Sequence, residues 1–222
     1  MWINLTTCNR LRKTIVSMER LAETNFPEDS HLIIFDDHSD TELIDYLEEY
    51  NERCIPNLRT ELVLNEYRLG CAGNIIESLY YCLSKTEDQY IIKIDSDTIY
   101  HPEWLNKLIE SHDRLLENNA SFGAISVFNA ERTHGFIEGF NKEIGVKKTM
   151  GGFCVMFNRI ILETFDFRKP LWQAETFDWN LGWASEKMGL NLYCTFKSYV
   201  EHMRGEGTHG DDGDHGRNFV GE

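Results

Sequence analysis

The sequence predicts an α/β protein with a single domain, in which helices flank a mostly parallel central sheet. In the first half of the chain, short apolar runs typical of strands alternate with longer amphipathic segments typical of helices. The chain has 222 residues, 41% of them hydrophobic, which suits one compact unit with a sizeable core. Such strand–helix–strand connections are right-handed, and ligands bind at the carboxyl ends of the strands.

Four strands are expected in the first half, at residues 2–5, 32–35, 61–64 and 90–94. The helices between them are indicated by apolar residues three and four positions apart. These residues are Leu11, Ile15, Met18 and Ala22, then Leu43, Leu47 and Tyr50, then Ala72, Ile75, Leu79 and Cys82. A further helix is expected from Pro102 to Leu115, since proline suits a first helical turn.

The second half of the chain is less regular. Strands are expected at 122–128, 153–157 and 192–200, and a helix at 177–188. Residues 129–147 are polar without a clear period and predict a loop. Residues 205–222 contain six Gly, two His and three Asp. We expect this Gly-rich tail to be flexible alone and to order as a lid over a bound ligand.

The overall charge argues against one broad class of function. The chain has 22 Lys and Arg against 37 Asp and Glu, a formal net charge of −15. A protein that holds nucleic acid mainly through its phosphates is therefore disfavoured. No apolar run approaches the ~20 residues of a membrane span, so we expect no transmembrane segment. The six cysteines are scattered without a C-x-x-C pair, which predicts reduced thiols and a cytoplasmic location.

The strongest local signal is Asp95-Ser96-Asp97, which directly follows the apolar run at 90–94. Two carboxylates at this edge can hold a hard cation, whose remaining ligands are phosphate oxygens and water. The alternative is an ordinary polar turn in which Asp97 caps the next element.

A second acidic pair follows the strand expected at 32–35, in the segment Asp36-Asp37-His38-Ser39-Asp40. Two neighbouring strands thus both end in paired acids, which repel unless a cation or a donor lies between them. A carboxylate here could accept the N–H of a nucleobase. The alternative is that Ser39 or Asp40 caps a helix.

Other candidates are spread along the chain. Arg68 could pair with a diphosphate, because guanidinium matches phosphate oxygens. Asp178 lies at the start of a helix, where it could be reactive or simply an N-cap. His202 follows a strand and could complete a metal shell, with His209 and His215 as weaker candidates. No G-x-G-x-x-G follows the first strand and no P-loop motif occurs, which disfavours Rossmann oxidoreductases and P-loop NTPases.

In combination, these segments resemble nucleotide-sugar glycosyltransferases of the GT-A fold, above all the inverting family 2. The matching segments, in chain order, are Thr6–Arg10 at the first strand end, Asp36–Asp40 ("DDxSxD"), Asn65–Asn74 ("NxGxxxAxN"), Asp95–Asp97 ("DxD"), Gly151–Phe157, Phe177–Leu181 ("EDxxL") and His202. Two departures are Tyr67-Arg68 in place of a glycine and Phe177 in place of a Glu. The resemblance covers about residues 2–204.

The resemblance implies a metal-dependent inverting transfer of a sugar from a nucleotide sugar, with UDP-sugar favoured, to an acceptor hydroxyl. It implies Asp178 as general base, with Glu175 as the fallback, and Asp97 and His202 as ligands of Mn²⁺ or Mg²⁺. The implied nucleotide-sugar contacts are Thr6, Arg10, Asp36, Asp37, Arg68, Asn74, Asp95, Ser96 and Gly152. Residues 1–100 would form the nucleotide-binding half and residues 101–204 the acceptor half.

Two other functions remain open. A nucleotidyltransferase would carry a Gly-rich basic segment after the first strand, and Leu11-Arg12-Lys13 lacks the glycines. A non-catalytic nucleotide-sugar-binding domain would lose Asp97 or Asp178, and this chain keeps both. The acceptor also remains open, with a glycan, a protein or a hydroxymethylated DNA base as candidates.

Overall fold

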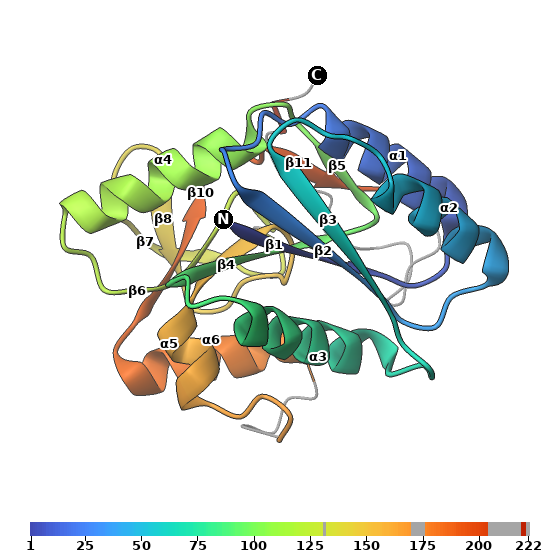
Figure 1. The fold of residues 1–222 in the computed structure, drawn as a ribbon. Helices are drawn as coiled ribbons and strands as arrows, with labels where there is room; N and C mark the ends of the chain where they lie inside the picture. Colours follow the sequence, from blue (N-terminus) through green and yellow to red (C-terminus); the bar gives the residue numbers. More distant parts are fainter. Residues whose placement is uncertain (131, 170–175, 204–218, 221–222) are drawn as a thin grey trace.

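The computed structural model describes residues 1–130, 132–169, 176–203 and 219–220. Its main feature is a nine-stranded sheet with the strand order β3-β2-β1-β4-β9-β6-β10-β8-β7 (Figure 1). A second sheet pairs two short strands, β11 and β5. The predicted fold class, a central sheet flanked by helices in one domain, is confirmed.

The first half of the chain forms the parallel part of the sheet. Its elements are β1 (Trp2–Thr7), α1 (Leu11–Ala22), β2 (Ser30–Asp36), α2 (Thr41–Asn51), β3 (Leu58–Leu64), α3 (Gly70–Lys85) and β4 (Tyr90–Asp95). The register places Thr7 opposite Asp36, and Thr6 opposite Asp95. The carboxyl ends of β2, β1 and β4 therefore meet at one edge, as the sequence predicts.

The second half extends the sheet with mixed directions. Its elements are β5 (Thr98–Tyr100), α4 (Trp104–Glu117), β6 (Phe122–Ser126), β7 (Phe136–Gly139), β8 (Ile144–Lys147), β9 (Val155–Asn158), α5 (Arg159–Thr164), α6 (Phe177–Met188), β10 (Asn191–Thr195) and β11 (Val200–His202). Strands β10 and β6 are parallel, whereas β9 is antiparallel to both of its neighbours. Helix α4 begins at Trp104, later than expected, because the Trp104 amide donates to the His101 carbonyl in a turn before the helix.

The expectation of a loop at 129–147 is wrong, because this segment contains β7 and β8. Strand β8 pairs with β10 and all of its residues are buried. Its buried character was hidden by Gly145 and by Lys147, whose Nζ is buried 2.9 Å from Asn129 Oδ1 and over the Phe136 ring. Pairing with β10 therefore decided the structure where local polarity indicated a loop.

The expectation of one strand at 192–200 is also corrected. The segment splits into β10, in the main sheet, and β11, which pairs antiparallel with β5. The break is a short turn in which Thr195 Oγ1 donates to the Lys197 carbonyl at 2.6 Å. The short elements β5 and α5 were not expected from the sequence.

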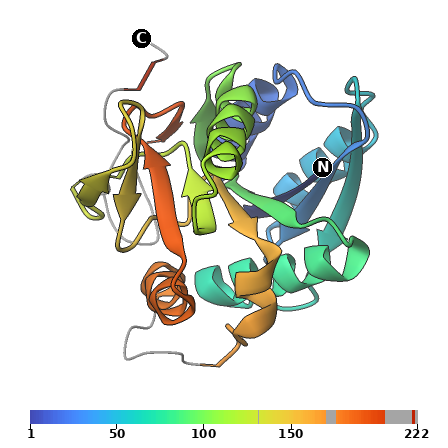
Figure 2. The same cartoon turned by 90° about the vertical axis from the view of Figure 1, so that its left-hand side faces the viewer.

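Helices cover both faces of the sheet, as Figures 1 and 2 show. Helices α1, α2 and α4 pack on one face, through residues such as Met18, Leu47 and Trp104. Helices α3, α5 and α6 pack on the other, through residues such as Leu79 and Leu181. Burial of one such side chain contributes roughly 1.5–3 kcal/mol, so these two apolar layers hold the strands in place.

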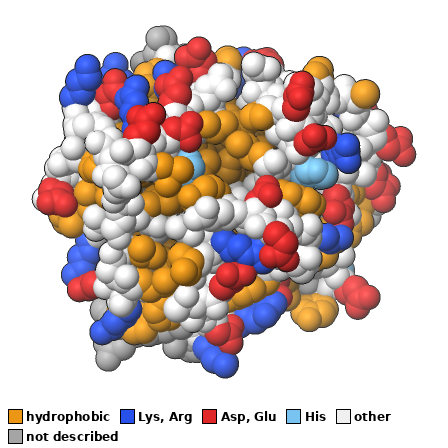
Figure 3. Space-filling model, turned by 60° about the vertical axis from the view of Figure 1, so that its left-hand side comes forward, with side chains coloured by type: hydrophobic (Ala, Val, Ile, Leu, Met, Phe, Trp, Pro, Cys, Tyr) orange, Lys and Arg blue, Asp and Glu red, His pale blue; other side chains and the backbone are white. Residues whose placement is uncertain are grey.

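The surface combines charged and apolar regions. In Figure 3, apolar side chains gather toward the middle of the displayed face, and charged side chains are spread around them. Among the helices that the structure describes, none is both long and apolar enough to span a membrane.

Candidate active site

The Asp97 carboxylate is the centre of one group of polar side chains. Ser96 and Asp97 form the tight turn between β4 and β5, and the Ser96 amide donates to the Thr6 carbonyl at 3.2 Å. Asp97 is 7% exposed. Its Oδ2 lies 2.7 Å from Arg10 Nη1 and 3.0 Å from His202 Nε2.

Strand pairing delivers His202 to Asp97 across more than a hundred residues of sequence. Strand β11 runs antiparallel to β5, with His202 opposite Thr98. The Met203 amide donates to the Asp97 carbonyl at 2.9 Å, and the Phe153 ring packs edge-on against His202 at 4.6 Å. Asp97 and His202 are therefore brought together as predicted.

The surroundings of Asp97 keep it ionised. Burial alone would raise its pKa, but the hydrogen bond and charge of His202, with the charges of Arg10 and Lys13, outweigh it. The net result is a pKa below the usual range of a carboxyl. Asp97 is therefore an anion at neutral pH, as a metal ligand must be.

Arg10 is held beside Asp97 by an unusual loop. Asn9 and Arg10 both have positive φ, at 53° and 61°, immediately before α1. The loop is fastened to the one after β2, because the Asn9 amide donates to Ser39 Oγ at 2.7 Å and the Asp40 amide to Asn9 Oδ1 at 2.9 Å. The left-handed turn thus directs the guanidinium toward the acidic edge.

Lys93 is a site residue that the sequence reasoning missed. It is 1% exposed, and its Nζ lies 2.6 and 2.5 Å from the two Asp95 carboxylate oxygens and 2.9 Å from the Gly152 carbonyl. Thr6 Oγ1 also donates to Asp95, at 2.8 Å. The signal was a lysine inside an apolar strand, two positions before Asp95 and so on the same face.

Asp178 lies in the first turn of α6. Thr176 is the N-cap of α6, so the alternative that Asp178 caps the helix does not hold. A Cβ on Gly152 would lie 3.2 Å from Asp178 Oδ1 and 3.9 Å from Lys93 Nζ, so this close approach favours glycine. Lys93, Gly152 and Asp178 are therefore contiguous.

Asp178 has the proton affinity of a weak base near neutral pH. Burial raises its pKa to about 6, and the Asp95 charge acts in the same direction, against Lys93 and the Gly152 amide. The side chain nevertheless keeps 31% of its surface exposed. A reachable carboxylate with such a pKa is suited to accept a proton from a substrate.

Asp36 and Asp37 hold loops together in this structure. Asp36 is fully buried and accepts from the Ser39 amide at 2.8 Å and from Ser39 Oγ at 2.5 Å. Burial raises its pKa. Asp37 accepts from the Leu69 and Gly70 amides, at 2.6 and 3.0 Å, at the start of α3. Asp40 is the N-cap residue of α2, as the capping alternative predicts, but its side chain makes no capping hydrogen bond there. Direct contact of Asp36 or Asp37 with a base stays a prediction.

Two further residues predicted to contact the nucleotide sugar are Asn74, which is buried, and Arg68, which is exposed. Asn74 is buried, and its Nδ2 lies 3.4 Å from the Thr7 carbonyl and 3.5 Å from the Phe35 carbonyl, which ties β1 to β2. Arg68 is exposed, and its Nη2 donates to the His38 carbonyl at 3.4 Å. Arg68 thus contacts the loop after β2 and not the group of polar side chains around Asp97.

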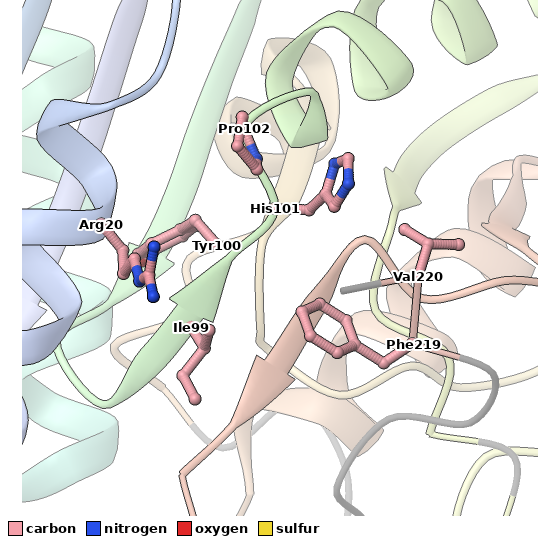
Figure 4. Close-up of a pocket in the computed structure, with 7 residues that line it drawn as sticks. All are labelled: Arg20, Ile99, Tyr100, His101, Pro102, Phe219 and Val220. Carbon is pink, nitrogen blue, oxygen red and sulfur yellow. The ribbon is translucent and has the colours of Figure 1, made fainter. Parts of the chain in front are cut away.

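Several predictions fall outside the described residues, namely Glu175, His209, His215 and the expected lid at 205–218 and 221–222. Residues 219 and 220 are described, and the Val220 amide donates to the Ser198 carbonyl at 3.2 Å. Phe219 and Val220 line one side of a pocket (Figure 4). Its lining is Arg20, Ile99, Tyr100, His101, Pro102, Phe219 and Val220, which includes no predicted site residue.

Asp97 and His202 offer a carboxylate oxygen and an imidazole nitrogen, donor types that divalent ions accept. Asp97 Oδ2 and His202 Nε2 are 3.0 Å apart, the separation expected for neighbouring ligands at right angles around an ion with bonds of about 2.1 Å. Within residues 1–130, 132–169, 176–203 and 219–220, no group of three His, Cys, Asp or Glu could hold a metal.

Solved glycosyltransferase structures share this fold. PcManGT, a mannosyltransferase from Pyrobaculum calidifontis solved with GDP-Man and Mn²⁺, superposes with a TM-score of 0.60 at 17% identity, covering 86% of this chain and 52% of its own. S. aureus TarS 1-349 with UDP-GlcNAc gives 0.63 at 14% identity, covering 94% and 60%. This chain therefore spans little more than half the length of these proteins.

The sequence itself identifies the family. No curated protein sequence matches the chain. Residues 3–165, well over half of the chain, match Glycosyl transferase family 2. This range contains Asp97 and Lys93, while α6 and β11 supply Asp178 and His202 from beyond it. The chain thus belongs to glycosyl transferase family 2 and has the GT-A fold of these structures.

Proposed function

We propose that the protein is a metal-dependent, inverting glycosyltransferase that uses a nucleotide-sugar donor. The observation that carries this proposal is the separation of two kinds of carboxylate. Asp97 is buried with a lowered pKa beside His202, whereas Asp178 is partly exposed with a pKa of about 6. One is suited to hold a cation and the other to accept a proton.

Asp97 and His202 would hold the divalent ion, Mn²⁺ or Mg²⁺. Bound there, such an ion neutralises charge on the leaving diphosphate, which makes the glycosyl–diphosphate bond easier to break. Arg10, 2.7 Å from Asp97, adds a fixed positive charge at the same place. Support for the ion comes from the mannosyltransferase of the same fold, which was solved with Mn²⁺.

The donor would lie along the carboxyl edge of β2, β1 and β4, in the half formed by residues 1–100. Thr6, Asp95 and Ser96 line this edge and would contact the nucleoside, while Asp36, Asp37 and Asn74 keep its loops in shape. Structures of the same fold hold UDP-GlcNAc or GDP-Man. We favour a UDP-sugar, and Arg68 would contact it only if its loop moved inward.

Asp178 would act as general base, from the acceptor half formed by residues 101–204. It takes the proton of the acceptor hydroxyl while the oxygen attacks the anomeric carbon and the diphosphate leaves with the bonding electrons. Attack from the face opposite the leaving group inverts the anomeric centre. Lys93 offsets the repulsion between Asp95 and Asp178, because it pairs with Asp95 and its charge lowers the pKa of Asp178. The acceptor is a glycan, a protein or a hydroxymethylated DNA base.

The test is a screen of the purified protein against UDP- and GDP-sugars, each with Mn²⁺, Mg²⁺ or chelator. We expect metal-dependent donor hydrolysis, and a rise in Tm that needs both donor and metal. Release of pyrophosphate from a sugar phosphate and a nucleoside triphosphate would instead indicate a nucleotidyltransferase. A Tm shift without hydrolysis or transfer to any acceptor would indicate a binding domain.

A further inference from the structure

His134 lies beside the proposed base and belongs to none of the motifs in the sequence. It lies in the segment between β6 and β7 and is 5% exposed. Its Nδ1 is 2.8 Å from Thr149 Oγ1, and its Nε2 is 3.7 Å from Asp178 Oδ2. A buried imidazole that faces a carboxylate with one nitrogen and a hydroxyl with the other has a defined orientation.

The contact with Thr149 holds Nδ1, so Nε2 is the ring nitrogen that faces Asp178. A threonine hydroxyl can donate to Nδ1 or accept from it, and when it donates, the proton of a neutral ring is on Nε2. In that tautomer the Nε2–H faces Asp178 Oδ2, 3.7 Å away. The other oxygen, Oδ1, lies on the Gly152 side, so different groups control the two oxygens.

We propose that His134 is a positioning residue that keeps Asp178 in its ionised form by directing Nε2–H at Oδ2. This proposal rests on the proposed role of Asp178 as the base. In the transfer step, Asp178 takes the acceptor proton and later releases it to water. His134 touches neither the sugar nor the reacting atoms.

The other groups around Asp178 leave this role to His134. Lys93 and Asp95 face it from β4, but Lys93 is paired with Asp95 at 2.5–2.6 Å. The Cys71 thiol on α3 lies within the field of the same charges, and burial raises its pKa, so it is neutral. Among the described residues, His134 places a ring nitrogen 3.7 Å from Oδ2.

The packing of α6 against residues 148–149 holds Asp178 close to the backbone that carries Thr149. Gly182, one turn after Asp178, lies so close to residues 148–149 that an added Cβ would be 2.6 Å from the Lys148 carbonyl and 2.8 Å from Thr149 Cγ2. The backbone that carries Thr149 therefore touches the helix that carries Asp178. This contact limits sliding of the helix relative to His134.

The experiment is the pH profile of kcat for His134→Phe, His134→Gln and the unchanged protein. His134→Phe keeps ring volume and removes the N–H, so we expect the acid limb, near pH 6, to move up by about one unit. The loss in kcat is then about tenfold below pH 6 and small above pH 8, while KM for the donor stays unchanged. His134→Gln restores an N–H and should return the limb toward its original position. An acid limb that stays in place in His134→Phe overturns the proposal.

A second measurement needs no turnover and covers the case in which His134→Phe does not fold. The difference in Tm between the protein and its Asp178→Asn variant, followed from pH 4 to 8, reports the ionisation of Asp178. Thr149→Val removes the hydroxyl that orients His134, and we expect it to move this transition to higher pH. An unmoved transition overturns the role of His134. Full activity of Asp178→Asn overturns instead the proposed base, and so separates the two failures.

Discussion

At the scale of single residues, the ionised Asp178 lowers the stability of the folded protein and is also the proposed general base. Asp178 has a pKa of about 6 in the folded protein, against an ordinary value of 3.8. The folded state thus binds this proton more tightly than the unfolded state does. Ionisation of Asp178 therefore costs native stability, an effect that is absent below pH 3.8 and grows as the pH rises through 6.

Asp178→Asn is therefore expected to change stability and activity in opposite directions. Asparagine cannot ionise, so the variant should have a higher Tm than the unchanged protein at pH 7.5. Sugar transfer should fall by about 10²–10⁴-fold, the usual contribution of a positioned base. Scanning calorimetry at pH 7.5 and pH 4 checks the first point, since the Tm difference must shrink at the lower pH. A lower Tm at pH 7.5 would contradict the raised pKa.

Lys93, in contrast, is expected to stabilise the folded state, because its buried charge pairs with Asp95. It is buried against Asp95, and removal of one partner of such a pair costs about 3–5 kcal/mol. Lys93→Met should therefore lower the free energy of unfolding by roughly that amount. Lys93→Met combined with Asp95→Asn should recover part of it, because no unpaired charge remains.

The matched control for Lys93 is Lys85→Met on α3. Lys85 pairs with Glu61 at the surface, where an ion pair contributes only about 0–1 kcal/mol. Urea unfolding of the three variants measures these differences. Equal losses in Lys93→Met and Lys85→Met would show that burial of the Lys93 pair has no special effect.

At the scale of elements, the close contact between α6 and residues 148–149 positions the proposed base. Gly182→Ala would place a methyl group 2.6 Å from the Lys148 carbonyl, which is backbone and cannot turn aside. We expect a loss of roughly 1–3 kcal/mol in unfolding free energy, and a fall in kcat because Asp178 moves with the helix. Glu186→Ala, at an exposed position of the same helix, is the control and should change neither. Unchanged stability of Gly182→Ala would show that the helix can shift freely.

At the scale of the whole molecule, the proposed metal site joins the two halves of the chain. Asp97 follows β4, and His202 ends β11 near the end of the described chain. Donor and Mn²⁺ together should therefore raise the Tm more than the sum of their separate effects, because each completes the shell of the other.

Asp97→Asn tests this coupling, because it keeps the shape of the side chain and removes its charge. We expect the joint rise in Tm and the transfer activity to be lost while the far-UV circular dichroism stays the same. Asp45→Asn, an exposed acid on α2, removes the same charge elsewhere and should retain both. Full transfer activity in the presence of chelator would refute the role of the metal.

The sequence by itself determined the fold class, the first four strands and the acidic edge. The parallel strands are short apolar runs, and the helices between them have a clear period, so local pattern and final structure agree. Asp95 and Asp97 were found for the same reason, since they directly follow a strand.

Only the tertiary structure decided the second half of the chain and the contacts between distant residues. Strands β7 and β8 exist because β10 pairs with β8, and β11 exists because β5 offers it an edge. Lys93 has its role because Asp95 and the Gly152 carbonyl both accept its hydrogen bonds, and His134 because Asp178 on α6 lies beside it. Such contacts depend on which segments meet in space, and no periodicity within one segment contains that information.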